Sequence, residues 1–184
     1  GLAAVGGFVP LVLHDPAHDP LPEIDRALDS LVSVGARVVA IAAVSAVDGY
    51  DRAPQLAPTD WPTLLGNQDR IAGGAEKRGV TAALHPHVGT LVEGPDDVCR
   101  VLGASRIALC VDTGHLAFAG VDPLELVREA PARVAHVHLK DVDMAVAQRA
   151  RRGESTYTEA VAHGLFRPLG HGGPNSRVYA FCRA

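Results

Sequence analysis

Five apolar runs alternate with helical patterns along the chain. The runs have the length and composition of buried strands, and they occupy residues 1–15, 36–44, 79–90, 106–115 and 133–141. Between them, apolar residues recur at helical spacing in residues 23–35, 60–78, 95–103 and 123–130. Each interval between neighbouring runs therefore contains one helical segment. This order predicts a parallel sheet in a single α/β domain over residues 1–184.

Turn and cap residues limit these helices. Gly35 and Gly79 are expected to end the first two, and Asp60 is a candidate N-cap for the second. Residues 45–59 form a long polar segment with two prolines, and loops of that length are usually functional or poorly ordered. Towards the C-terminus the pattern weakens, with one further helix predicted over residues 156–162 and no clear motif beyond residue 172.

The run at residues 106–115 places a carboxylate at the mouth of the core. Its larger apolar side chains alternate with small ones, so in an extended strand Asp112 shares a face with Ala108 and Cys110. An unpaired carboxylate is costly to bury, so Asp112 must meet a cation, a metal or several hydrogen-bond donors. The alternative is that Asp112 only caps the turn that follows it.

Three polar residues end successive predicted strands. His85, Asp112 and His138 are separated by 27 and 26 residues. In parallel sheets the carboxyl ends of the strands surround a common mouth, where reactive groups gather. These three side chains are therefore expected to converge.

Alternation within the strands indicates a polar interior. His85 shares a face with His87. In residues 133–141, one face is expected to carry Val134, His136, His138 and Lys140, and the other Ala135, Val137 and Leu139. The second set can pack on helices, so the polar set points inward, as in a barrel rather than an open sheet.

Two imidazoles and a carboxylate suit a divalent transition metal such as Mn, Co, Zn or Fe. His85, Asp112 and His138 would leave open positions for substrate oxygens, and a nearby His or Lys could move protons. Other interpretations stay open for neighbouring residues: His136 could be an interior histidine, and Lys140 could pair with Asp141 or Asp143 on the rim. Solvent exposure is the default for the loop histidines His14, His18, His163 and His171.

Composition limits the function classes. The chain has 184 residues, 47% of them hydrophobic and 21% charged, which is typical of a globular protein. A net charge of −4 with scattered basic residues disfavours nucleic acid as a partner. The three cysteines form no CxxC pair, which indicates a reducing compartment, and Cys110 is expected to be a core residue. The apolar N-terminus lacks a basic region and is too short for a membrane span, so a cytoplasmic location without membrane contact is expected.

Four segments resemble a known family. HPHVGT (85–90), VDTGH (111–115), HVHLKD (136–141) and FRPLGHG (166–172) occur in this order. The set is similar to the sugar phosphate isomerase/epimerase superfamily, the xylose isomerase-like TIM barrels, and most of all to the inosose dehydratases of inositol catabolism. The resemblance covers residues 6–172 and implies an α/β (β/α)8 barrel. Against that pattern, the first strand and the eighth strand with its metal-binding Glu are missing, so the barrel is expected to be incomplete.

The resemblance also implies residue roles. Asp112 matches the family's fifth-strand metal ligand and His138 the sixth-strand ligand. His85 stands at the fourth-strand position, which is Glu in many relatives. Lys140 and His87 would transfer protons, and the remaining pair, His115 and Asp141, would contact the substrate.

The implied function is metal-dependent dehydration of a cyclic polyol ketone, an inosose, through a metal-stabilised enolate. Mn or Co is favoured as the cofactor, and Zn, Fe or Mg is compatible. The partner would be a small polyol or sugar, and a homo-oligomer is compatible with the sequence. Alternatives are a ketose epimerase or isomerase on the same scaffold, a DNA repair protein related to the AP endonucleases, and a non-catalytic barrel remnant.

Overall fold

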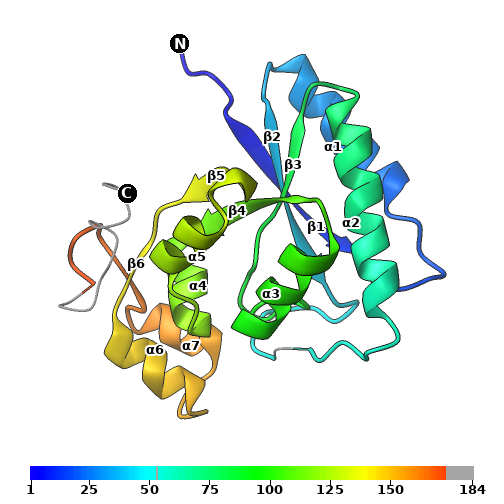
Figure 1. Cartoon of the computed structure of the whole chain (residues 1–184). Helices are drawn as coiled ribbons and strands as arrows, with labels where there is room; N and C mark the ends of the chain where they lie inside the picture. Colours follow the sequence, from blue (N-terminus) through cyan, green and yellow to red (C-terminus); the bar gives the residue numbers. More distant parts are fainter. Residues whose placement is uncertain (53, 173–184) are drawn as a thin grey trace.

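The computed structural model describes residues 1–52 and 54–172 and contains one five-stranded parallel sheet (Figure 1). Its strands follow one another in chain order: β1 (Gly6–Val12), β2 (Val38–Val44), β3 (Thr81–Leu84), β4 (Ala108–Asp112) and β5 (Val134–His138). The connecting helices are α1 (Leu21–Ser33), α2 (Trp61–Glu76), α3 (Pro95–Ala104), α4 (Thr113–Ala119) and α5 (Pro123–Glu129), with a 3-10 turn at Pro131–Arg133. The five predicted strands and the four predicted helices between them are confirmed, and α4 is an additional helix between β4 and β5 that was not predicted.

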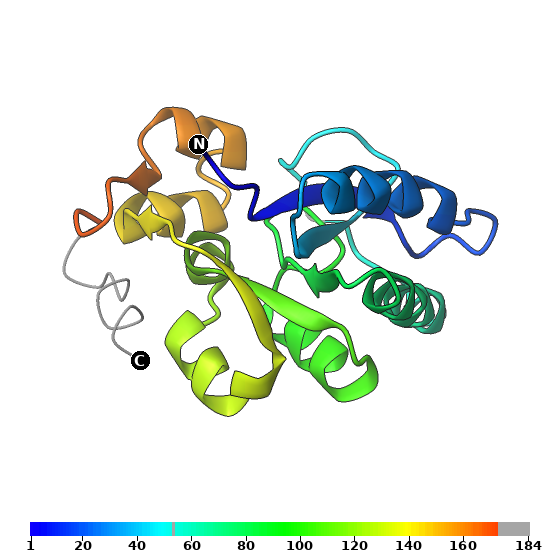
Figure 2. The same ribbon diagram turned by 90° about the horizontal axis from the view of Figure 1, so that it is seen from above.

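The sheet is curved and its helices cover one face. Seen from above in Figure 2, α1, α2, α3 and α5 follow one another around the outside of the strands as part of a ring. Within the described residues, β1 and β5 are the two edges of the sheet and do not pair with each other. The expected incomplete barrel is thus present as an open arc, because five strands cannot close the ring.

Alternation along β4 divides the core into two layers, as predicted. Ile107, Leu109 and Val111 belong to the large cluster between the sheet and the helices. On the opposite face, Cys110 packs with Ala40 and Ala83 of the neighbouring strands. Small side chains therefore line the inner face of the sheet below the carboxyl ends of the strands.

A β-bulge in β5 overturns part of the predicted face assignment. Leu109 pairs with Val134 and Cys110 pairs with His136, so Ala135 is the extra residue. Val134 consequently packs against the outer core instead of sharing a face with His136. Ala135 and Leu139, which were expected to pack on helices, are exposed. Beyond the bulge, His138 pairs with Asp112 and keeps its predicted inward face.

Local features at the helix ends differ from the expectations in two places. Asp60 occupies the N-cap position of α2, but its side chain makes no capping hydrogen bond.

The C-terminal part contains a helix that was not predicted, α6 (Met144–Arg151), and a small antiparallel pair, β6 (Asp141–Val142) with β7 (Phe166–Arg167). The predicted last helix is α7 (Tyr157–Ala162), which begins with a capping box between Thr156 and Glu159. Cys182 lies outside the described residues. None of the described helices is long and apolar enough to cross a membrane.

Candidate metal and catalytic site

Asp112 ends β4 and also begins α4. Its Oδ1 accepts hydrogen bonds of 3.0 Å from the backbone N–H groups of Gly114 and His115. The carboxylate therefore caps the helix, as the simpler interpretation of the sequence held. Only one of its two oxygens is used for this purpose.

The second oxygen of Asp112 is the meeting point of three cationic or imidazole groups. Its Oδ2 lies 2.6 Å from Nζ of Lys140, 3.2 Å from Nε2 of His85 and 3.5 Å from Nδ1 of His138. Asp112 is fully buried and His85 is almost fully buried, whereas His138 and Lys140 are about one-third exposed. The structure thus brings together the three strand-end residues of the sequence analysis and adds Lys140 to them.

The environment of Asp112 keeps it ionised. Burial alone would raise the pKa of its carboxyl, but hydrogen bonds from His138 and His85 and the nearby Lys140 charge outweigh burial and hold this pKa well below its usual range. The alternative pairing of Lys140 with Asp141 or Asp143 is wrong, because its ammonium bonds to Asp112.

Backbone packing fixes Lys140 over the carboxylate. Its N–H donates to Oγ1 of Thr113, whose hydroxyl donates to the Lys140 carbonyl at 2.7 Å. A Cβ at Gly114 would lie 2.6 Å from Cβ of Lys140 and 3.0 Å from the Phe166 ring. Only glycine lets the lysine approach so closely, which explains the glycine in the DTGH segment.

His87 and His115 form a second imidazole pair beside Asp112. Their ring centroids are 3.7 Å apart. Burial lowers the pKa of His87 to about 4 and that of His115 to about 2, so both rings are neutral at pH 7. Nδ1 of His87 lies 2.7 Å from the Val88 carbonyl, while the buried Nδ1 of His115 has no hydrogen-bond partner among the described residues.

Asp141 is placed differently from the other predicted site residues. Its Oδ2 accepts hydrogen bonds from the N–H groups of Gly170 and Gly172, and its Oδ1 from that of Val142. A side chain at Gly172 would run into this carboxylate. Within the described residues, Asp141 therefore holds the segment that follows β7.

The remaining histidines divide by burial. His136 is partly buried, and desolvation lowers its pKa. His163 and His171 are exposed, as expected for loop histidines. The expectation of solvated rings is wrong for His14 and His18, which are half-buried and each keep one buried ring nitrogen without a partner in the described part of the chain.

Two tyrosines that sequence reasoning missed border the imidazole pair. The Tyr50 ring lies 4.5 Å from that of His87, and the Tyr157 ring lies 6.1 Å from that of His115. Both tyrosines line a cavity of about 570 Å³. Asp51, which also lines it, accepts a 2.7 Å hydrogen bond from the Thr158 N–H. The length of the 45–59 loop was the available signal, because loops this long often carry function.

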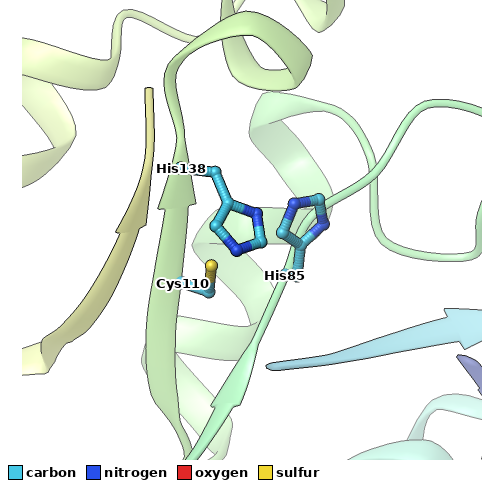
Figure 3. A group of neighbouring side chains, drawn as sticks. All are labelled: His85, Cys110 and His138. Atoms are coloured by element: carbon cyan, nitrogen blue, oxygen red, sulfur yellow. The ribbon is translucent and has the colours of Figure 1, made fainter. Parts of the chain in front are cut away.

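Among the described residues, two sets of three side chains have the spacing of a metal site, and both include His85. The predicted set of His85, Asp112 and His138 is not one of these two, although both imidazoles lie within 3.5 Å of Oδ2 of Asp112. His85, Asp112 and His115 form one set, and His85, Cys110 and His138 form the other; within each set the ligand atoms lie within 4.8 Å of one another. Figure 3 shows the second set, drawn from the ends of β3 and β5 and from the middle of β4. Burial raises the pKa of the Cys110 thiol to about 12, so without a metal it is a neutral core side chain, as expected.

The chain is similar to proteins of one fold family. A family model described as Xylose isomerase-like TIM barrel matches residues 6–180. Inosose dehydratase of Geobacillus thermodenitrificans is 29% identical over 154 residues, which is 78% of this chain and 52% of that protein. Rhizopine catabolism protein MocC of Rhizobium meliloti is 36% identical over 122 residues, which is 65% of this chain and 38% of that protein.

A solved structure supports the same fold. The probable 3-DHS dehydratase AsbF from Bacillus anthracis superposes with a TM-score of 0.73 at 14% identity, covering 98% of this chain and 65% of that one. At this identity the likeness concerns the fold alone. The chain spans about half the length of the inosose dehydratase that it matches.

Proposed function

Because the chain belongs to the xylose isomerase-like TIM barrel family, we propose that this protein is a metal-dependent lyase that removes water from a cyclic polyol ketone of the inosose class. The observation that carries the proposal is the convergence of His85, His138 and Lys140 on one buried oxygen of Asp112 at the carboxyl ends of the strands. The similarity to inosose dehydratase supports the substrate class.

The metal would be held by His85, Asp112 and His138. Two imidazole nitrogens and one carboxylate oxygen suit Mn, Co, Fe or Zn and leave further positions open. The buried, ionised Asp112 supplies the negative charge that such an ion requires. When bound, the ion supplies Lewis acidity to a substrate oxygen. It would compete with the Lys140 ammonium for Asp112.

Lys140 and His87 are the proposed proton carriers. The reaction removes a proton from the carbon next to the ketone and expels the β-hydroxyl, which takes up a proton and leaves as water. His87 is neutral at pH 7 because its pKa is lowered to about 4, so its free nitrogen can accept a proton. Lys140 carries the ammonium that can protonate the leaving hydroxyl. The product is the enol of a conjugated dione.

A dehydration assay with an inosose as substrate tests this proposal. The protein is incubated with Mn²⁺ or Co²⁺ and an inosose, and the absorbance of a conjugated dione is followed. The proposal predicts metal-dependent appearance of this product. Unchanged inosose would refute it, and an epimerised ketone without dehydration would establish the alternative epimerase on the same scaffold.

A further inference from the structure

A cysteine lies directly below the carboxylate of the proposed metal site. Cys110 precedes Asp112 by two residues on β4, so the two side chains share the inner face of the sheet. Cys110 is fully buried and packs with Ala40 and Ala83, which carry only methyl groups.

The two histidines of the proposed site lie close to this sulfur. One ligand atom from each of His85, Cys110 and His138 lies within 4.8 Å of the others. Figure 3 shows both imidazole rings side by side, with the Cys110 sulfur below the His138 ring. Atoms bound to one tetrahedral zinc ion lie roughly 3.5 Å apart, given Zn–S of about 2.3 Å and Zn–N of about 2.0 Å. Side-chain shifts of about 1 Å would therefore bring all three onto one ion.

We propose that Cys110 is a metal ligand, and that His85, Cys110 and His138 together bind a thiophilic divalent ion such as Zn²⁺ below Asp112. Binding releases the thiol proton to solvent and forms a sulfur–metal bond. The inference adds a second, lower position for the ion, which shares His85 and His138 with the position proposed above, and it rests on the proposed function only for any effect on turnover.

The position with Cys110 and the position with Asp112 are expected to favour different ions, because their ligand atoms differ. Sulfur and imidazole favour Zn²⁺ or Co²⁺, whereas Mn²⁺ favours the carboxylate oxygen of Asp112. Because both positions use His85, they are alternatives for a single ion. With an ion in the lower position, Asp112 keeps its 2.6 Å ion pair with Lys140.

Cobalt spectroscopy tests the sulfur ligand directly. The chain has three cysteines, so a Cys99→Ser/Cys182→Ser background leaves Cys110 as its single thiol. We expect Co²⁺ to give a near-ultraviolet thiolate-to-cobalt absorption band in this background and in the wild type. Cys110→Ser should lose the band and bind Zn²⁺ about tenfold more weakly or worse, with Mn²⁺ affinity unchanged.

The matched control is Cys99→Ser alone, because Cys99 is an exposed thiol on α3. Cys110→Ala provides a second, apolar variant if the serine variant fails to fold, as judged by circular dichroism. Absence of the band in the single-thiol background, or its persistence in a folded Cys110 variant, would overturn the proposal. Inosose turnover is measured separately, so loss of turnover with a retained band would count against the proposed function and leave the sulfur ligand standing.

Discussion

Replacing Asp112 by asparagine separates the two tasks of its carboxylate. The amide oxygen of Asp112→Asn can still accept the Gly114 and His115 N–H bonds, and Asn caps helices about as well as Asp. The amide NH₂ would instead face the Lys140 ammonium, which loses its partner. Breaking a buried ion pair costs about 3–5 kcal/mol. Lys140 is 35% exposed and can reach water, so we expect about 1–3 kcal/mol.

Asp112→Ala should cost about 1 kcal/mol more than Asp112→Asn, because it also removes the helix cap. The assay is urea unfolding in the presence of a chelator, so that no metal contributes. Lys140→Met in the asparagine background should recover part of the loss, since it removes the unpaired charge. Equal stability of Asp112→Asn and wild type, or strictly additive effects of the two substitutions, would refute the reasoning.

Three further predictions concern the surroundings of Asp112. Gly114→Ala should lower the unfolding free energy by about 1–3 kcal/mol in the same urea assay, because the new Cβ would clash with Lys140. As a control, Gly103→Ala, at an unobstructed helical position, should raise the unfolding free energy by about 0.5–1 kcal/mol. Lys140→Met should lower kcat for inosose by about 10²-fold or more while the exposed Lys77→Met does not, as measured by dione absorbance; equal rates would contradict the assigned proton transfer. A divalent ion at 100 times its Kd should add about 2.7 kcal/mol to stability, visible as a higher Tm, and His85→Ala should abolish that gain; an unchanged gain would place the ion elsewhere.

Much of the site's location follows from the chain's periodicity. The alternation along β4 correctly placed Asp112 and Cys110 on the inner face, opposite the packed face of Leu109. The regular spacing of the strand ends along the chain correctly predicted that His85 and His138 lie beside Asp112. These features repeat along the sequence, so local patterns suffice to predict them.

The remaining features depend on tertiary contacts. The bulge at Ala135 changes the face of Val134 without leaving a sequence signal, because it is set by the register against β4. Helix α4 directly follows β4 and has only seven residues, so the helix is too short to show a recognisable helical period in the sequence. The Tyr50 and Tyr157 walls come from segments distant in sequence that meet only in the fold.

The most direct test of the central claim is solvent deuterium incorporation. The claim is that residues around Asp112, with a divalent ion, remove the proton next to the ketone of a cyclic polyol. Inosose is incubated in D₂O with the protein and Mn²⁺ or Co²⁺, and unreacted substrate and product are examined by NMR. The account predicts that the product has lost the proton next to the ketone and carries one deuterium at the carbon that lost the β-hydroxyl, where the enol of the dione takes up solvent deuterium. This labelled product should be lost on adding chelator and strongly reduced in Asp112→Asn. No incorporation by the wild type, or equal incorporation by a folded Asp112→Asn variant, would contradict it.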